Sequence, residues 1–316
     1  MADDVRYLRF YLHADSDGQI AVKKKMPTRS STHPVYREFR KLFRILVTHG
    51  IRKVRLVGGD DPALREDLAD VVAMVASVEG IREVAITTRG VGLAGRMETL
   101  TSAGMSAVNF NIDTFKPDRF KAISGSDRCA DAWAAVDDAL SLGLRVKLNV
   151  VAQRGVNDDE VVDFVNLTQR QPVQVRFVEW NSDTEVVASP DRFLSTAETM
   201  AAIKPPLVPR SPSRLDGPAL VYDIPEHKGS IGFIPNVTEH FCSRCGRIGL
   251  TDQGEILSCI FGKGLSLVRH LRSPGGVAAV SAFVDRVLRR KVLLASKLEG
   301  YPVPPAKVTG AAHVSA

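Results

Sequence analysis

Short apolar runs rich in β-branched residues alternate with amphipathic segments over the first 180 residues of the chain. The apolar runs predict strands, and apolar residues spaced three or four positions apart predict helices. The expected strands are Val5–Leu12, Arg52–Val57, Glu83–Thr87, Ser106–Ile112, Arg145–Val151 and Val173–Trp180. The expected helices are Pro34–His49, Leu64–Val78, Leu93–Ser102, two helices that start at Phe115 and Ala130, and Asp158–Gln169.

Strands that are each separated by a helix predict a parallel sheet with right-handed crossovers. Six such strands indicate an α/β fold, a partial (β/α)6 TIM-like barrel. Active sites in sheets of this kind lie at the carboxyl ends of the strands. We therefore expect ligand-binding side chains at that edge.

The alternation ends after Trp180, because residues 181–220 are irregular and contain six prolines. The later expected elements are a helix over Thr196–Ile203, strands over Leu220–Ile224 and Ser230–Ile234, and a basic helix around Val277–Val292. We expect a barrel in residues 1–180, a carboxyl-terminal extension in residues 181–300 and a flexible tail in residues 301–316.

Composition narrows the class of protein. The chain has 316 residues, of which 44% are hydrophobic and 25% charged, which is typical of a globular protein. No apolar run could span a bilayer and the first residues do not resemble a signal peptide, so we expect a cytoplasmic protein without a membrane partner. The net charge of +6 suits an anionic ligand, but an excess of this size is also common among proteins that bind nothing charged. We expect no nucleic-acid partner, and a homodimer is an open option.

Three of the four cysteines lie close together, at Cys242, Cys245 and Cys259, whereas Cys129 is remote. A C-x2-C pair lets two thiolates face one metal centre. A closed zinc site needs a fourth ligand, for which His240 is a candidate. An iron–sulfur cluster accepts three cysteines and leaves one iron open, so we favour it over zinc. Cys129 is expected to be a bystander.

Two basic residues, Lys147 and Arg176, lie within strands that are otherwise rich in valine. Burying a cation inside a barrel costs free energy unless a negatively charged or polar group compensates it. One such group is an anionic ligand. The alternative is a buried ion pair, for example with Asp113 or Glu179.

Short motifs in a fixed order connect these features. They are Leu8-Arg9, Lys53-Val-Arg55-Leu-Val-Gly58-Gly59, Thr87-Thr88-Arg-Gly90, Asn111-Ile-Asp113-Thr114, Gly155-Val-Asn157-Asp158-Asp159-Glu160, Arg176-Phe-Val-Glu179 and the cysteine segment with Arg247. In this series the chain resembles the GTP 3′,8-cyclase family, radical S-adenosylmethionine enzymes of molybdenum-cofactor biosynthesis. The resemblance implies a six-stranded partial barrel with a second, carboxyl-terminal cluster.

The resemblance fails where the family holds its first cluster. The family has a C-x3-C-x2-C loop before Met-Pro, and its cysteines hold the cluster that cleaves S-adenosylmethionine. Here the segment from His13 to Lys25 precedes Met26-Pro27 and contains no cysteine. Ammonium groups such as those of Lys23–Lys25 cannot replace thiolates on iron. We expect these lysines to form a solvated loop; the alternatives are that they occupy the emptied cluster pocket or hold phosphate electrostatically.

The family's Gly-Gly-Glu-Pro motif is also altered, to Gly58-Gly59-Asp60-Asp61-Pro62. We therefore expect no bound S-adenosylmethionine and interpret a set of positions as remnants of its site. These are Gly58, Gly59, Thr87 and Asn111.

The parts that remain concern the second cluster and the nucleotide. The resemblance implies one [4Fe-4S] cluster on Cys242, Cys245 and Cys259, with an open iron that faces the substrate. It implies a nucleotide site made by Lys53, Arg55, Lys147, Arg176 and Arg247. The family's second arginine near Arg247 is replaced by Gly249.

We therefore predict a divergent cyclase-like protein that binds one cluster and an anionic substrate without cleaving S-adenosylmethionine. The open iron would serve as a substrate ligand or Lewis acid, which would make the protein a lyase-type iron–sulfur enzyme. One alternative is a non-catalytic binding or regulatory homologue. The other is an active GTP 3′,8-cyclase.

Overall fold

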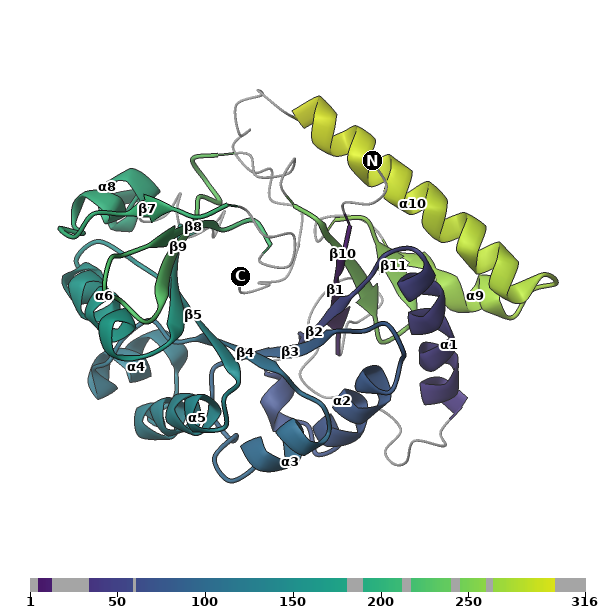
Figure 1. Cartoon of the computed structure of the whole chain (residues 1–316), viewed down its shortest axis with the longest axis horizontal. Coiled ribbons are helices and arrows are strands. Elements are labelled where there is room, and N and C mark those ends of the chain that lie inside the picture. Colours follow the sequence, from purple (N-terminus) through teal and green to yellow (C-terminus); the bar gives the residue numbers. More distant parts are fainter. Residues whose placement is uncertain are drawn as a thin grey trace.

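The computed structural model describes residues 5–12, 34–58, 61–180, 190–211, 217–239, 245–259 and 264–298. A 12-stranded sheet has the order β12-β11-β10-β1-β2-β3-β4-β5-β6-β9-β8-β7. The strands from β10 through β1–β6 to β9 are parallel, and the strands outside them are antiparallel. The parallel part curves around a central space with the helices on its outer side (Figure 1). The prediction of a partial α/β barrel is confirmed.

The strands are β1 (Tyr7–Tyr11), β2 (Lys53–Val57), β3 (Glu83–Thr88), β4 (Ala107–Asn111), β5 (Arg145–Val151), β6 (Val173–Val178), β7 (Val208–Pro209), β8 (Leu220–Asp223), β9 (Ser230–Ile234), β10 (Arg247–Thr251), β11 (Glu255–Leu257) and β12 (Leu265–Ser266). The α-helices are α1 (Pro34–Thr48), α2 (Leu68–Ala76), α3 (Met97–Ser102), α4 (Pro117–Ser124), α5 (Cys129–Ser141), α6 (Val161–Arg170), α8 (Thr196–Ala201), α9 (Leu267–Leu271) and α10 (Gly276–Leu298). Short 3-10 helices are η2 (Pro62–Leu64), η3 (Asp158–Glu160) and η4 (Pro190–Arg192).

The predicted elements all occur, with shifted ends. The helix expected from Leu93 begins only at Met97, because Gly92 and Gly95 have positive φ values of +83° and +72° in the turn before it. The sequence did not predict β7, β10, β11, β12 or α9. The expected tail in residues 301–316 lies outside the described residues.

Apolar side chains of the barrel strands point outward and form the core with the helices. Phe10 of β1 packs against α1, with ring centroids 5.1 Å from Phe39 and 5.3 Å from Phe43. Because side chains alternate along a strand, its neighbours Arg9 and Tyr11 face the other way. Polar positions therefore lie on the inner face of the barrel.

The carboxyl-terminal half extends this sheet at both edges. Strand β10 pairs in parallel with β1, so that Arg247 lies opposite Tyr7, and β9 pairs in parallel with β6. Residues from both ends of the chain thus share the inner face. Within the described ranges, no helix combines the length and apolar character needed to cross a membrane.

Candidate functional site

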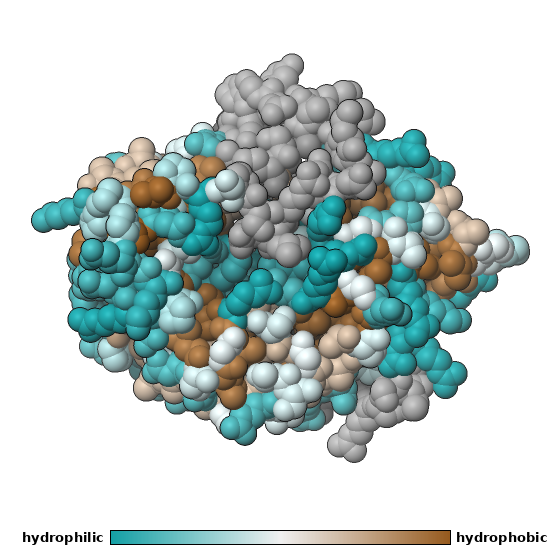
Figure 2. Space-filling view, viewed as in Figure 1, coloured by the Kyte–Doolittle hydropathy of each residue, from teal (hydrophilic) through white to brown (hydrophobic). Residues whose placement is uncertain are grey.

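The inner face of the barrel is polar and basic. In β1, Tyr7, Arg9 and Tyr11 alternate with the core residues Leu8 and Phe10. The inner positions of the other strands include Lys53, Arg55, Glu83, Thr87, Asn109, Asn111, Lys147, Asn149, Gln174, Arg176 and Arg247. Hydrophilic residues lie near the middle of the face seen in Figure 2, with apolar residues beside them.

The five basic residues predicted to bind a nucleotide are all buried on this face. They are Lys53, Arg55, Lys147, Arg176 and Arg247. Burial lowers the pKa of Arg55 to about 9, and the nearby guanidinium groups of Arg9, Arg247 and Arg176 act in the same direction. Arg55 remains charged at neutral pH. The arrangement therefore concentrates like charges at the centre of the barrel, which favours a bound anion.

One acidic side chain, Glu83 of β3, lies among these cations. Its carboxylate is 2.9 Å from Nζ of Lys53 and 2.5 Å from a terminal nitrogen of Arg145. Both Lys53 and Glu83 are almost fully buried. The pair neutralises one cation at the amino ends of the strands and is thus structural.

Among the described residues, no ion pair joins Lys147 or Arg176 to Asp113 or Glu179, the two partners predicted as examples. Asp113 accepts a hydrogen bond from the backbone N–H of Val151 at 2.6 Å. Glu179 accepts hydrogen bonds from Thr196, Val237 and Thr238. These carboxylates hold loops rather than the inner cations.

Several buried polar atoms of the inner face have no hydrogen-bond partner among the described residues. They are the hydroxyl groups of Tyr7, Tyr11 and Thr87, Nε of Arg9 and Arg55, and Nδ2 of Asn109. Buried polar groups are normally paired, and leaving one unpaired costs about 1–3 kcal/mol. Their number and common direction fit a polar ligand.

Sequence reasoning missed Tyr7, Arg9, Tyr11 and Asn109 as site residues. Arg9 carried the same signal as Lys147, a cation inside an apolar strand. The tyrosines carried no such signal, because tyrosine is common in buried strands. Only the pairing of β1 with β2 and β10 shows that they share the basic face.

Strands β10 and β11 form an antiparallel hairpin between Cys245 and Cys259. Cys245 precedes β10 and Cys259 follows β11, and the register pairs Gly249 with Leu257. The hairpin therefore brings Cys245 and Cys259 to one end of the two strands. Cys242 lies outside the described residues. Among those that the structure describes, no group of three or more His, Cys, Asp or Glu side chains is placed to hold a metal ion.

Cys245 has the electrostatic environment of a thiolate ligand. Burial opposes ionisation, but Arg247 and Lys291 bring the pKa of this thiol down to about 7. Arg247 also donates a hydrogen bond from Nε to its sulfur at 3.2 Å. Thiolates are the form in which cysteine binds iron, so this environment fits a metal cluster.

The predicted remnants of the S-adenosylmethionine site lie at the carboxyl ends of β2, β3 and β4. Gly58 has φ of +103°, and a Cβ atom there would be 3.1 Å from the carbonyl oxygen of Leu12. Asn111 accepts a hydrogen bond from Asn149 at 2.8 Å, whereas the hydroxyl of Thr87 is unpartnered within the described residues. Gly59 lies outside the described residues.

Asp61, in the altered motif Gly58-Gly59-Asp60-Asp61-Pro62, has a structural role. Asp61 accepts hydrogen bonds from the hydroxyl of Thr88 at 2.9 Å, from the N–H of Arg89 at 2.6 Å and from the N–H of Ala63 at 2.9 Å. Its carboxylate therefore fixes the end of β3 and begins η2.

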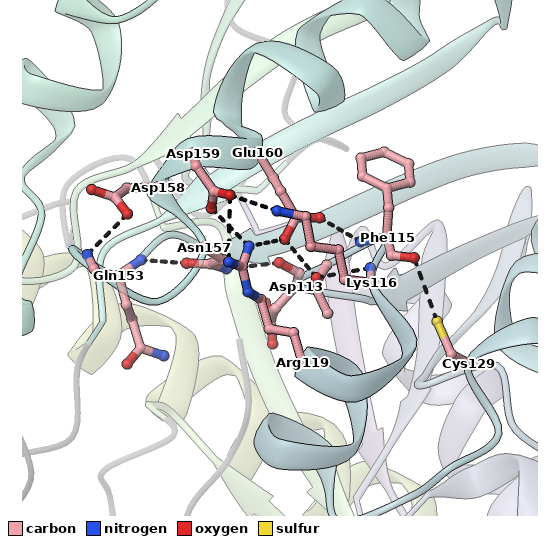
Figure 3. A network of polar contacts seen from close by, with 12 residues as sticks. Asp113, Phe115, Lys116, Arg119, Cys129, Gln153, Asn157, Asp158, Asp159 and Glu160 are labelled. Atoms are coloured by element: carbon pink, nitrogen blue, oxygen red, sulfur yellow. Dashed lines mark hydrogen bonds and ion pairs between the residues drawn. The ribbon is translucent and has the colours of Figure 1, made fainter.

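A second polar network joins the loops after β4 and β5 (Figure 3). Glu160 accepts hydrogen bonds from the hydroxyl of Thr114 and the N–H of Phe115, both at 2.6 Å, and pairs with Arg119. Asn157 donates from its amide to the carbonyl oxygen of Asp113 at 2.7 Å. The residues of the Asn157–Glu160 motif therefore form a clasp, a set of hydrogen bonds that connects the loop after β5 to the loop after β4.

Cys129 lies beside this clasp, at the start of α5. Its sulfur is 3.9 Å from the carbonyl oxygen of Phe115, and burial raises the pKa of its thiol. A buried thiol of this kind is a poor metal ligand.

Comparisons with known proteins agree with this geometry. Residues 21–168 match the family model for the Radical SAM superfamily, and residues 173–293 match that for Molybdenum Cofactor Synthesis C. The chain is 36% identical to a GTP 3′,8-cyclase of Pelotomaculum thermopropionicum over 272 residues, which cover 84% of this chain and 83% of the relative. It is 35% identical to a GTP 3′,8-cyclase of Moorella thermoacetica over 258 residues, 80% of each chain.

Two further matches cover less of the other protein. A match of 37% identity to Molybdenum cofactor biosynthesis protein 1 of Drosophila melanogaster covers 71% of this chain and 40% of that protein. The crystal structure of Streptococcus suis SuiB bound to S-adenosylmethionine superposes with a TM-score of 0.53 at 10% identity, over 88% of this chain and 68% of SuiB. On the evidence of its two relatives with high coverage, the chain belongs to the GTP 3′,8-cyclase family of the radical SAM superfamily.

Proposed function

We propose that this protein is a divergent member of the family that binds a nucleotide or similar small anion in its barrel and does not cleave S-adenosylmethionine. The main support for the proposal is that the chain has the basic residues of the ligand site but lacks the cysteines of the first cluster. The basic inner face is complete except at Gly249, whereas no cysteine precedes Cys129. The residues needed for the ligand are kept, and the thiolates needed for the first cluster are missing.

The first cluster of the radical SAM superfamily does not fit the residues present. Cys129 is buried and its sulfur faces a backbone carbonyl group. Using the remaining cysteines for that cluster would dismantle the second site. The chain therefore lacks the ligands for that cluster.

The second cluster fits better. Cys242, Cys245 and Cys259 would hold it, and Arg247 and Lys291 would stabilise the thiolate of Cys245. A [4Fe-4S] cluster with three cysteine ligands supplies one open iron that can act as a Lewis acid. The basic side chains of the barrel would bind and orient the anion and neutralise its charge.

A non-catalytic binding role is the second candidate. Most polar groups seen on the inner face are cations or neutral donors, and the carboxylate of Glu83 is already paired with Lys53. This composition favours holding an anion over abstracting a proton from it. Comparing nucleotide binding with turnover would separate the two roles.

Anaerobic reconstitution followed by two assays tests the proposal. We expect about four irons and four sulfides per chain, the content of one cluster. With dithionite and S-adenosylmethionine we expect no 5′-deoxyadenosine, while a superfamily member that has the C-x3-C-x2-C loop serves as the positive control. Substantial 5′-deoxyadenosine, or a second cluster, would restore the active-cyclase alternative.

A further inference from the structure

Two tyrosines of β1, Tyr7 and Tyr11, point buried hydroxyl groups to the inner face. Tyr7 is 2% exposed and Tyr11 is 8% exposed. The Tyr7 hydroxyl has no hydrogen-bond partner among the described residues, and the Tyr11 hydroxyl has only the side chain of Arg9 beside it, outside ideal hydrogen-bond geometry. A phenylalanine would fill the same space without a buried unpaired hydroxyl, so both hydroxyls need a further explanation.

Tyr7 lies within the group of cations. Nζ of Lys53 is 4.6 Å from its ring centroid, and the guanidinium carbon of Arg55 is 5.3 Å from it. Arg247 is its register partner on β10. An anionic oxygen attracted by Arg55 and Arg247 would therefore lie within reach of a hydroxyl donor.

Tyr11 occupies space that a glycine leaves open. A Cβ atom at Gly249 would be 2.9 Å from Cε2 of Tyr11 and 3.0 Å from Cβ of Leu257. Such a contact is too close for a carbon pair, so any larger residue at position 249 must displace the ring. The position of the Tyr11 ring thus depends on Gly249.

We propose that the hydroxyl groups of Tyr7 and Tyr11 are two further ligand contacts, one on each side of Arg9, that donate hydrogen bonds to the bound anion. The inference rests on the proposed anion-binding function. The two residues are four positions apart on an extended strand, so their Cα atoms are about 13 Å apart. A nucleoside polyphosphate is long enough to contact both hydroxyl groups.

Binding of GTP and of inorganic tripolyphosphate to the reconstituted full-length protein tests this proposal, by isothermal titration calorimetry. We expect Tyr7→Phe and Tyr11→Phe each to weaken GTP binding about tenfold, the effect of one hydrogen bond to a charged group. Tyr222→Phe, on the outer strand β8, is the matched control and should bind GTP as the wild type does. The melting temperature without ligand should stay the same or rise in Tyr7→Phe and Tyr11→Phe.

The dependence on Gly249 adds an independent readout. Gly249→Ala should weaken GTP binding when Tyr11 is present and have little further effect in the Tyr11→Phe background, a coupling that a double-mutant cycle measures. Wild-type affinity in both tyrosine variants would overturn the tyrosine contacts but leave anion binding intact. Weaker binding together with a lower melting temperature would indicate a structural role and overturn them as well. A wild-type protein that binds neither GTP nor tripolyphosphate would overturn the proposed function along with this inference.

Discussion

Arg247 donates a hydrogen bond from Nε to the sulfur of Cys245, over 3.2 Å. The same arginine is the register partner of Tyr7 on the basic inner face. One residue therefore links the cysteine segment to the proposed anion site. We therefore expect a substitution in the cysteine segment to alter anion binding, and a bound anion to alter the environment of Cys245, through Arg247.

Cys245→Ala should lose most of the iron that the wild type binds after anaerobic reconstitution. The expected content falls from about four irons per chain to below about one, because two cysteines do not hold a cubic cluster. Cys129→Ala is the matched control and should keep the wild-type iron content, since its thiol lies at the start of α5. Equal iron loss in both variants would contradict the assignment. Iron and sulfide analysis gives the measurement.

Arg55→Met should weaken binding of tripolyphosphate by about tenfold to a hundredfold, because a charge-assisted hydrogen bond is lost from a buried site. Without ligand, the variant should be as stable as the wild type or more stable, since Arg55 is repelled by Arg9, Arg176 and Arg247. Calorimetry and thermal unfolding measure the two effects. Arg128→Met, at an exposed pair with Asp131, should change neither. A large loss of stability without loss of affinity in Arg55→Met would argue against an anion site.

Glu83→Gln should lower the free energy of unfolding by about 3 kcal/mol, because it leaves the buried ammonium group of Lys53 without its counterion. The matched control is Asp159→Asn, which breaks exposed pairs with Lys116 and Arg119 and should cost at most about 1 kcal/mol. Urea denaturation measures both values. Similar small losses in the two variants would show that the buried pair has no special structural role.

Asp113 should make stability depend on pH between about 4 and 6. Burial raises the pKa of its carboxyl group to about 6 in the folded protein, against 3.8 in the unfolded chain. The folded state therefore binds the proton more tightly in this window, and this contribution to stability falls as the pH rises through it. Asp113→Asn mimics the protonated form and lacks this dependence.

We accordingly expect Asp113→Asn to be more stable than the wild type at pH 7. The expected gain in the free energy of unfolding is about 1–2 kcal/mol, which is less than the full pKa shift corresponds to, because solvent reaches part of the side chain. At pH 4 the difference should nearly vanish. Urea denaturation of both proteins at the two pH values measures it. A difference that is the same at both values would show that Asp113 does not titrate in this range.

The sequence was sufficient to predict β1–β6 and the helices between them, because each is specified by a local pattern. It was not sufficient for β10–β12. Strand β10 is short and pairs with β1, whose residue Tyr7 is 240 positions from its partner Arg247. Pairing over such a separation depends on the closed sheet and leaves no local signal.

The candidate site divides in the same way. The buried position of Lys147 and Arg176 was predictable, because a cation in a valine-rich strand is unusual. The roles of Tyr11 and Gly249 could not be predicted. The absence of a side chain at Gly249 matters only because the ring of Tyr11 lies beside it, and the sequence does not show that they are neighbours. The network around Glu160 likewise joins residues from two loops that lie far apart in the sequence.

The alternation along β1 also bears on how such a protein can change during evolution. Phe10 packs against α1, whereas Arg9 and Tyr11 face the inner space of the barrel. Packing energy and ligand chemistry thus depend on different positions of the same strand. A lineage can exchange residues on the inner face one at a time while its outer layer keeps the molecule folded.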